Sequence, residues 1–530
     1  MLKNSFVLRY ISNIAIIAIL VFLLLLNQTS CSQEITPENN RQSSPNVIFI
    51  YVDDFNYNQV GCYGGNVSTP NIDKLANEGV KFSHYYPCSS LCTPSRFSAL
   101  TGRYPSRSLS LLEKFPTDDS AFIQWGEDII EGEPTIAHLM KQHGYATGFA
   151  GKWHNSSEGL LPLLHVPDHE NPESPSIRSR IEENYELTSE HVKKTSGFDF
   201  VEAVYATNLK WLPITEKLMY HNQHWITYNS LKFIEQNKDK PFFLYMATTL
   251  VHHPQAIESL RSDPRATPAG FLTEHLDCQP SYENILERAD KAGLKSTGEL
   301  NTWATMSWLD DGVGATLKKL DELGLRENTM IIFASDNDSP GKTTCYQGRA
   351  PFIVNWEGHI KKGEICNELV SNVDIVPTAL AICNVKKAAD IKIDGLSLTP
   401  LLQKSNYSWR NSLYMEVAYT RAIVTKDYKY IAIRYPKDIQ RLITKTNRRE
   451  FTHEGFHLNK NQLAHFNMPN IYPGYFDDDQ LYDLKNDSLE KHNLANNPEY
   501  SQERKKKQKE LKKHSEDLSF SFGEFKKAKK

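Results

Sequence analysis

Short apolar runs alternate with helical patterns between residue 46 and about residue 399. Four runs are almost wholly apolar, at residues 46–52, 146–150, 241–251 and 329–335. Strands that are buried on both faces have this character. Apolar residues at helical spacing lie between them, at residues 71–78, 134–143, 221–237 and 303–323. The alternation predicts an α/β fold with a large, mostly parallel sheet flanked by helices.

The pattern changes after about residue 401. Residues 413–417, 421–424 and 428–433 form short runs that favour antiparallel strands. We therefore expect a catalytic domain at 45–400 and a smaller C-terminal α+β subdomain at 401–530. Residues 504–530 are rich in lysine and predict a terminal helix, which we interpret as a solvated helix and not as a binding surface.

Polar residues follow directly after each of the four apolar runs. They are Asp53 and Asp54, Lys152 and His154, His252 and His253, and Asp336 and Asn337. Parallel sheets bind ligands outside the carboxyl ends of their strands, so we expect these side chains to share one crevice. Three carboxylates and an amide oxygen favour calcium, with magnesium possible, and without a cation the carboxylates would repel one another. A single aspartate could instead cap its loop, but that does not explain both pairs.

A cysteine precedes a predicted helix at residues 92–96, which read Cys-Thr-Pro-Ser-Arg. Pro94 suits the first turn of a helix, so Cys92 lies near a helix N-terminus, where free N–H groups favour anions. Arg96 adds a fixed positive charge with planar donor geometry. Considered without its neighbours, Cys92 would be interpreted as a structural or disulfide-bonded cysteine.

The string at 92–96, followed by Leu-Thr-Gly-Arg at 100–103, resembles the signature of the sulfatase family. Further strings match in order: Gly-Lys-Trp-His at 151–154, His-His-Pro at 252–254, Lys342 with Tyr346, and Leu-Tyr-Asp-Leu at 481–484. The chain departs from the family pattern at Asp338, where glycine is usual, at Gln347 in place of glutamate, and in the shortened stretch 349–351. These departures affect the alignment of Arg349 but not that of Lys342.

The resemblance implies an alkaline-phosphatase-like fold and a Cys92 that is oxidised to formylglycine. A formylglycine-generating or anaerobic maturation enzyme would carry out that oxidation. One divalent cation would be bound by Asp53, Asp54, Asp336, Asn337 and the modified Cys92. Arg96 would stabilise the modified residue, Lys152 would bind near it, and His154 would act as the base that releases sulfate. His252 and Lys342 would contact the sulfate, and either of them could protonate the leaving group.

Two other interpretations stay open at this point. A phosphatase or phosphodiesterase on a related scaffold would use two zinc ions, several histidine ligands and an unmodified Ser or Thr, whereas the expected ligands here are oxygen-rich. If Cys92 is unmodified, the chain could be an exported glycan-binding protein without catalytic activity. We expect a sulfated glycan as substrate, with a pocket shaped by loops at residues 160–195 and 255–299.

The N-terminus predicts export. Lys3 and Arg9 precede an apolar stretch at residues 14–26, which is typical of a signal peptide, although a longer membrane span that includes residues 6–11 is an alternative. Cys31 follows small residues, as at a bacterial lipoprotein cleavage site. We therefore expect a signal at 1–31, a lipid anchor at Cys31, a tether at 32–44, and a periplasmic, membrane-anchored or secreted protein.

Composition narrows the classes of partner. The chain has 530 residues, of which 40% are hydrophobic and 23% charged, as in an ordinary globular enzyme. Its net charge of -4 gives no reason to expect nucleic acid as a partner. Export permits disulfides among the 8 cysteines, but the sequence does not predict their pairing.

Overall fold

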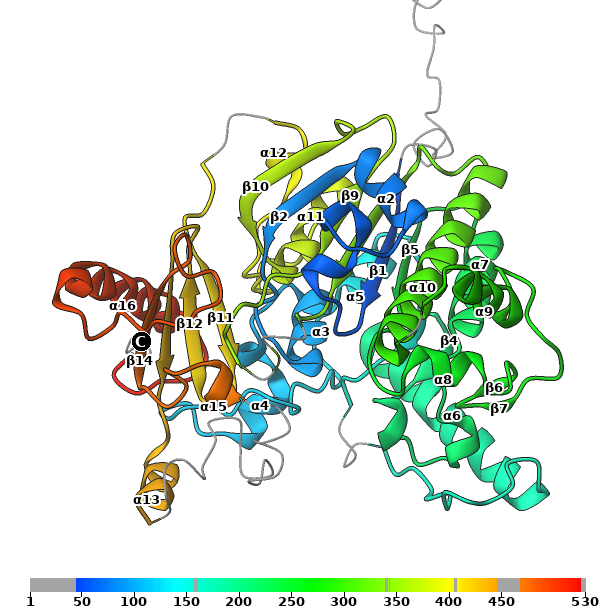
Figure 1. Cartoon of the computed structure of the whole chain (residues 1–530), viewed down its shortest axis with the longest axis horizontal. Helices are drawn as coiled ribbons and strands as arrows, with labels where there is room; N and C mark the ends of the chain where they lie inside the picture. Colours follow the sequence, from blue (N-terminus) through cyan, green and yellow to red (C-terminus); the bar gives the residue numbers. More distant parts are fainter. Residues whose placement is uncertain are drawn as a thin grey trace, which may run out of the picture. The chain divides into compact units, whose positions relative to one another are not determined.

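An eight-stranded sheet forms the centre of the fold (Figure 1). The computed structural model describes residues 44–525 except 157–160, 295, 339–341, 343, 405–407 and 446–467. The strand order is β10-β2-β9-β8-β1-β5-β3-β4. The strands are β1 (Asn46–Val52), β2 (Val80–Tyr85), β3 (Ala146–Lys152), β4 (Phe200–Tyr205), β5 (Phe242–Ala247), β8 (Thr329–Ser335), β9 (Phe352–Asn355) and β10 (Glu364–Val370).

The sheet is parallel apart from one strand. β9 runs antiparallel to its neighbours β8 and β2, and the other pairs are parallel. The predicted mostly parallel sheet is therefore confirmed. β1 lies between β5 and β8, with Val47 opposite Phe243 and Met330.

Alternate side chains of each central strand pack into two different hydrophobic cores. In β1, Ile48 and Ile50 face one core and Phe49 faces the other. Helices α2, α7 and α10 supply the first core, while α3, α5 and α11 supply the second. The helices are α2 (Pro70–Asn77), α3 (Cys92–Thr101), α4 (Leu109–Lys114), α5 (Ile136–Gln142), α6 (Pro175–Ser196), α7 (Gln223–Gln236), α8 (Ala256–Leu260), α9 (Tyr282–Lys291), α10 (Thr297–Glu322), α11 (Ile375–Ile382), α12 (Thr399–Leu402), α13 (Lys437–Lys445), α15 (Met468–Ile471) and α16 (Ser501–Glu516).

A second, antiparallel sheet follows in the C-terminal part of the chain. Its order is β11-β12-β13-β14, and its strands are β11 (Leu413–Val417), β12 (Thr420–Val424), β13 (Tyr428–Ile433) and β14 (Asp479–Asp483). Helix α16 packs on β12 and β13 through Leu511, which is fully buried. This arrangement confirms the C-terminal α+β subdomain. Since residues Pro45–Lys530 form one compact unit, the domain boundary at residue 400 stays a prediction.

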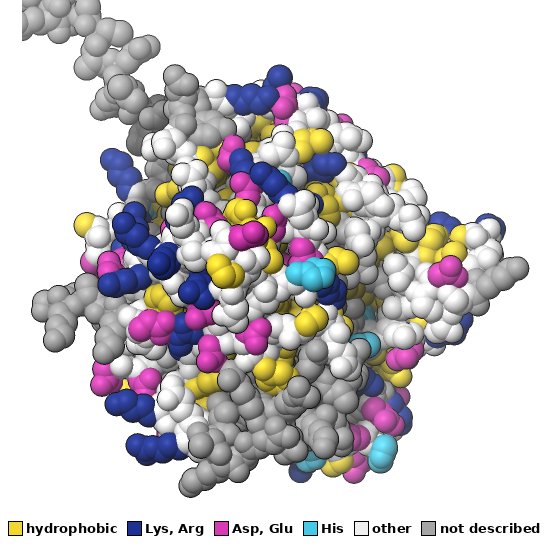
Figure 2. Space-filling model, turned by 60° about the vertical axis from the view of Figure 1, so that its left-hand side comes forward, with side chains coloured by type: hydrophobic (Ala, Val, Ile, Leu, Met, Phe, Trp, Pro, Cys, Tyr) yellow, Lys and Arg dark blue, Asp and Glu magenta, His cyan; other side chains and the backbone are white. Residues whose placement is uncertain are grey.

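The lysine-rich segment is helical over a shorter range than predicted, because α16 ends at Glu516. Lys506 and Lys507 pair with Glu503, and Lys507 also pairs with Glu510. Figure 2 shows acidic and basic side chains intermingled on the face of the molecule that includes this subdomain. Lys507 is buried on the same face of α16 as Leu511, so the interpretation of a solvated helix applies only to the opposite face.

Both segments that we expected to be loops contain regular structure. Residues 160–195 include most of α6, and residues 255–299 include α8, α9 and the short pair β6 (Ala266–Thr267) and β7 (Gly270–Phe271). Helix α6 was missed because its buried face mixes apolar and polar residues: Ile177 and Ile181 are followed by Asn184 and Thr188. That pattern gives only a weak apolar stripe.

The predictions for the N-terminus lie outside the described residues. These are the signal peptide, the lipid anchor at Cys31 and the tether up to residue 43. No helix in the described part of the chain is long and apolar enough to cross a membrane. The seven cysteines of that part are all free thiols.

Candidate active site

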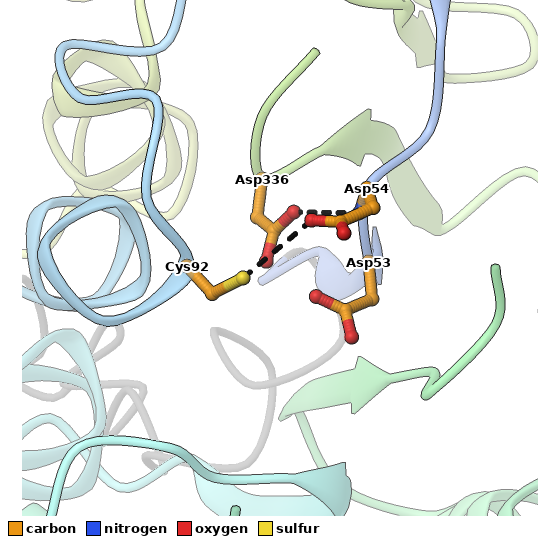
Figure 3. A group of neighbouring side chains, drawn as sticks. All are labelled: Asp53, Asp54, Cys92 and Asp336. Atoms are coloured by element: carbon orange, nitrogen blue, oxygen red, sulfur yellow. Dashed lines mark hydrogen bonds between the residues drawn. The ribbon is translucent and has the colours of Figure 1, made fainter. Parts of the chain in front are cut away.

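The ends of two adjacent strands bring the predicted metal ligands together. Asp53 and Asp54 follow β1, while Asp336 follows β8, and Cys92 is the first residue of α3. One ligand atom from each of these four residues lies within 4.8 Å of the other three. Figure 3 shows the thiol and the carboxylates around a common space. The convergence predicted from the strand ends is thus present in the structure.

Unusual backbone conformations hold the strand ends in place. Asp54 and His154 have φ values of 58° and 59°, in the left-handed region that costs most residues about 1–3 kcal/mol. Gly151 has φ 118°, and a Cβ there would lie 1.7 Å from the carbonyl oxygen of Ala247. Only glycine fits so close to the neighbouring strand. Gly151 therefore sets the path of the chain that carries Lys152 and His154.

Buried cations compensate the buried carboxylates. The Arg96 guanidinium is 2.8 Å from Asp336 Oδ2 and 3.3 Å from Asp53 Oδ1. Lys152 Nζ donates to Asp53 Oδ2 at 2.6 Å, and Lys342 Nζ donates to Asp54 Oδ2. A buried ion pair is favourable only when such contacts offset the loss of hydration. The three cations therefore allow three carboxylates to lie side by side inside the protein.

The carboxylates differ in acidity. Burial disfavours the ionised form of Asp53, but the charges of Lys152 and Arg96 outweigh burial and hold its pKa well below the usual value. Lys342 similarly lowers the pKa of Asp54 against the effect of burial. Burial raises the pKa of Asp336 to about 7 against the attraction of Arg96. In the absence of a cation, Asp336 is thus the carboxylate that ionises with most difficulty.

The Asn337 side chain completes the oxygen-rich set. Its Nδ2 donates to Asp54 Oδ1 and to Asp336 Oδ1, both at 2.8 Å, whereas its buried Oδ1 has no hydrogen-bond partner among the described residues. Rotation of the amide by 180° exchanges these atoms and turns Oδ1 toward the carboxylates. Carboxylate and amide oxygens are the ligands that hard divalent cations prefer. The residues present therefore fit such a cation.

The Cys92 thiol is buried beside this group. Its Sγ lies 3.6 Å from Asp54 Oδ1 and 3.6 Å from Asn337 Nδ2. Burial raises the pKa of the Cys92 thiol well above its usual value, despite the charges of Lys152 and Lys342. Since the thiolate is the reactive form, the unmodified thiol at this position is a poor nucleophile at neutral pH.

Two histidines flank the cluster in their neutral forms. His252 Nε2 lies 3.8 Å from Asp54 Oδ2, and burial lowers the pKa of His252 to about 4 despite that carboxylate. Burial and the charge of Lys152 lower the pKa of His154 well below its usual value. The His154 Nδ1 is buried and has no hydrogen-bond partner in the described structure. A neutral imidazole with a free nitrogen can accept a proton.

Lys342 lies at the same site and is held in its charged form. The attraction of Asp54, opposed by burial, raises the pKa of Lys342 above its usual value. The structure therefore brings together every site residue that the sequence predicted: Asp53, Asp54, Cys92, Arg96, Lys152, His154, His252, Asp336, Asn337 and Lys342.

Several supporting residues of the site were not predicted from the sequence. Asn208 follows β4 and accepts a hydrogen bond from Lys152 Nζ. Ser95 donates to the carbonyl oxygen of Asp336 and accepts from Asn372 Nδ2 at 2.9 Å. Asn208 could have been found by the rule of strand ends, but β4 was not recognised. Asn372 carries no comparable sequence signal.

Residues of the site line two cavities in the described structure. One has a volume of about 170 Å³ and is lined by Asp54 and His252 together with residues of α10. The other has a volume of about 770 Å³ and is lined by Thr93 and His154. The larger cavity therefore offers a sizeable space beside His154.

Comparisons with known proteins agree with this geometry. The family model described as Sulfatase matches residues 45–385, and that of N-sulphoglucosamine sulphohydrolase, C-terminal, matches residues 346–462. Human arylsulfatase A is 29% identical over 411 residues, which cover 71% of each chain. The N-acetylgalactosamine-6-O-sulfatase of Bacteroides thetaiotaomicron is 27% identical in an alignment 544 positions long, which covers 88% of this chain and 93% of that protein.

A solved structure shares the fold. The structure of BT4656 in complex with its substrate D-glucosamine-2-N,6-O-disulfate superposes on this chain with a TM-score of 0.56 at 21% sequence identity. The superposition covers 90% of this chain and 99% of that chain. The family match spans more than half of the chain and contains Asp53, Cys92 and Asp336. The chain therefore belongs to the sulfatase family and is a sulfuric ester hydrolase.

Proposed function

We propose that this enzyme removes sulfate from a sulfated carbohydrate, with a formylglycine at position 92 and one calcium ion. The observation that carries the proposal is the convergence of Asp53, Asp54, Cys92 and Asp336, whose ligand atoms lie within 4.8 Å of one another. The donor set of three carboxylates and an amide oxygen supports calcium, because magnesium is usually bound by only about one or two carboxylates and keeps several waters.

The cation and the modified residue would supply the electrophilic and nucleophilic chemistry. A divalent ion at these ligands would polarise a sulfate oxygen, and a hydrated formylglycine would provide an oxygen nucleophile. Asp53, Asp54, Asp336 and Asn337 would hold the ion. Arg96 is fully buried against Asp53 and Asp336 and would keep both carboxylates oriented.

The side chains around the cluster would bind the sulfate and move protons. Lys152 and Lys342 are positioned to neutralise the charge that develops on the sulfate oxygens. Because the pKa of Lys342 is raised and that of His252 is lowered to about 4, Lys342 is charged before the substrate arrives, whereas His252 is neutral. Both Lys342 and His252 lie beside Asp54, so either side chain could donate a proton to the leaving oxygen. His154, with its free Nδ1, would accept the proton when sulfate is released.

The substrate class rests on the relatives. Their names identify sulfated sugars, including N-acetylgalactosamine 6-sulfate and D-glucosamine-2-N,6-O-disulfate.

We further propose that the chain is exported and anchored by lipid at Cys31, and that a formylglycine-generating or anaerobic maturation enzyme converts Cys92. The basic residues and apolar stretch at the N-terminus and the cysteine at 92–96 support these proposals.

One experiment tests the proposed function. The protein is produced in a host that can form formylglycine, the peptide containing Cys92 is examined by mass spectrometry, and sulfate release is measured on both sulfated sugars. We expect conversion at position 92 and turnover of at least one sugar, and we expect Cys92→Ala to abolish turnover. Cys88→Ser is the matched control, because Cys88 is also buried in this segment and its Sγ hydrogen-bonds to Ser98 Oγ, at 3.1 Å, and not to the cluster. Turnover by Cys92→Ala would refute the proposal.

A further inference from the structure

The larger cavity combines an aromatic surface with His154 of the site. Trp211 and Trp125 line it, and their rings meet at 5.9 Å with an angle of 82° between their planes. Trp211 is 52% exposed and Trp125 is 36% exposed. Large aromatic side chains are usually more buried than this, so two adjacent exposed indoles indicate a binding surface.

This surface lies next to the reacting groups. The Trp211 ring is 6.3 Å from the ring of His154, and Thr93, the neighbour of Cys92, lines the same cavity. A molecule that presents a sulfate ester to position 92 would therefore extend past His154 onto Trp211. The other cavity near the cluster has only about 170 Å³, which leaves less room for a substituent.

The rest of the lining matches the chemistry of a sugar. Leu163, Val166 and Pro213 contribute apolar walls, while Asp168 and Lys210 contribute polar groups. Within the described part of the chain, neither of these two charged side chains has an oppositely charged partner. A pyranose ring has C–H groups on its faces and hydroxyl groups on its edges. Indole rings suit those faces, and a carboxylate and an ammonium suit the edges.

We propose that the cavity between Thr93 and Trp211 binds the sugar portion of the substrate, with Trp211 and Trp125 as its stacking surface and Asp168 and Lys210 as partners of its polar substituents. The volume of about 770 Å³ lies in the upper part of the range for ligand sites, about 300–1,000 Å³, and suits an oligosaccharide. This inference rests on the proposed function, since it assumes a sulfated carbohydrate.

The test separates the sugar contacts from the sulfate contacts. For wild type, Trp211→Ala, Trp211→Phe and Trp125→Ala, kcat/KM is measured on an oligosaccharide that carries whichever of the two sulfated sugars the wild type hydrolyses. The inhibition constant of inorganic phosphate is measured in parallel, because phosphate probes the sulfate position without a sugar. Tyr228→Ala is the matched control, since Tyr228 is 44% exposed and does not line this cavity.

We expect Trp211→Ala to lower kcat/KM about tenfold, mainly through a higher KM, and Trp125→Ala to lower it less. Trp211→Phe should keep most of the activity, and phosphate inhibition should change less than about twofold in every variant. The inference is overturned if both Trp→Ala variants hydrolyse the oligosaccharide as well as the Tyr228→Ala control. It is also overturned if the phosphate inhibition constant rises as much as KM, because Trp211 would then only support His154. Absence of sulfate release by the wild type, in contrast, would refute the proposed function itself.

Discussion

Glu127 carries a buried carboxyl group, and its ionisation at alkaline pH should lower the free energy of unfolding of the protein. Its side chain is fully buried, and neither carboxyl oxygen has a hydrogen-bond partner outside its own residue in the described structure. Burial, reinforced by the nearby charge of Asp128, raises the pKa of Glu127 from 4.5 to about 8. We expect Glu127→Gln, which cannot ionise, to be more stable than the wild type at high pH.

The pH range follows from the two pKa values. In the unfolded chain Glu127 loses its proton near pH 4.5, but in the folded protein it keeps the proton until about pH 8. Between these values the folded state binds more protons, so the free energy of unfolding falls as pH rises. At 1.36 kcal/mol per pH unit, the full loss is at most about 5 kcal/mol, and about 3 kcal/mol of it occurs between pH 5.5 and 8.5.

Thermal unfolding at a series of pH values measures this effect. For the roughly 450 described residues the entropy of unfolding is about 0.9 kcal/mol/K, so the difference in Tm between Glu127→Gln and the wild type should increase by about 3 °C between pH 5.5 and 8.5. Glu113→Gln is the control, because Glu113 is exposed in α4 and its replacement should leave the wild-type curve unchanged. Parallel curves of Tm against pH for Glu127→Gln and the wild type would refute this reasoning.

Two further predictions concern the metal and the N-terminus. Because Asp53 and Asp336 lie in one cluster of ligand atoms, Asp53→Ala and Asp336→Ala should each lose bound calcium and at least about a hundredfold in kcat/KM, measured by elemental analysis and sulfate release. Full activity of the wild type after dialysis against a chelator would contradict a metal-dependent mechanism. The Cys31→Ala variant should move from the membrane fraction to a soluble fraction, as measured by immunoblotting of fractionated cells. A wild type that is wholly soluble after signal cleavage would show that Cys31 carries no lipid.

The strands that position the metal ligands could be predicted because two independent sequence features indicate each of them. β1 and β8 are continuous apolar runs, and acidic residues end both of them, so their bounds agreed with the structure residue for residue. β4 was missed because Glu202 interrupts its apolar pattern. Asn208, which follows this strand, was therefore not predicted as a site residue. β10 was missed because it lies at the edge of the sheet, where Ile365 is exposed and polar residues alternate with it. The apolar pattern thus predicted the four adjacent strands β8, β1, β5 and β3, but it did not predict β2 and β9, which also lie inside the sheet.

The pairing of charges within the site could not be predicted from the sequence. The motifs indicated that Asp53, Asp54 and Asp336 meet, but not that Lys152 binds Asp53 while Lys342 binds Asp54. Such choices depend on differences of a few ångströms between groups up to 288 residues apart in the chain. For the same reason the sequence did not indicate that His252 and Lys342 would differ so strongly in acidity.

The strained turn at Asp54 shows how the fold sustains a site of this kind. A left-handed conformation at Asp54 is unfavourable by itself, so the surrounding structure must stabilise it. The Asp54 N–H donates to Asp336 Oδ1 at 3.0 Å, and the Phe55 N–H donates to Ser335 Oγ at 2.9 Å, so the end of β8 fixes one side of the turn.

The segment after β5 fixes the other side of the same turn. The Asp53 N–H donates to the carbonyl oxygen of Leu250 at 2.9 Å, and the Val251 N–H donates to that of Asp53 at 2.7 Å. With a net contribution of about 0.5–1.5 kcal/mol each, the four hydrogen bonds around the turn are sufficient to offset a strain of about 1–3 kcal/mol. β1 can supply two ligands from consecutive residues because it is a central strand, with a neighbour on each side to hold its end. An edge strand would have only one such neighbour, which explains why the ligands of this site come from the middle of the sheet.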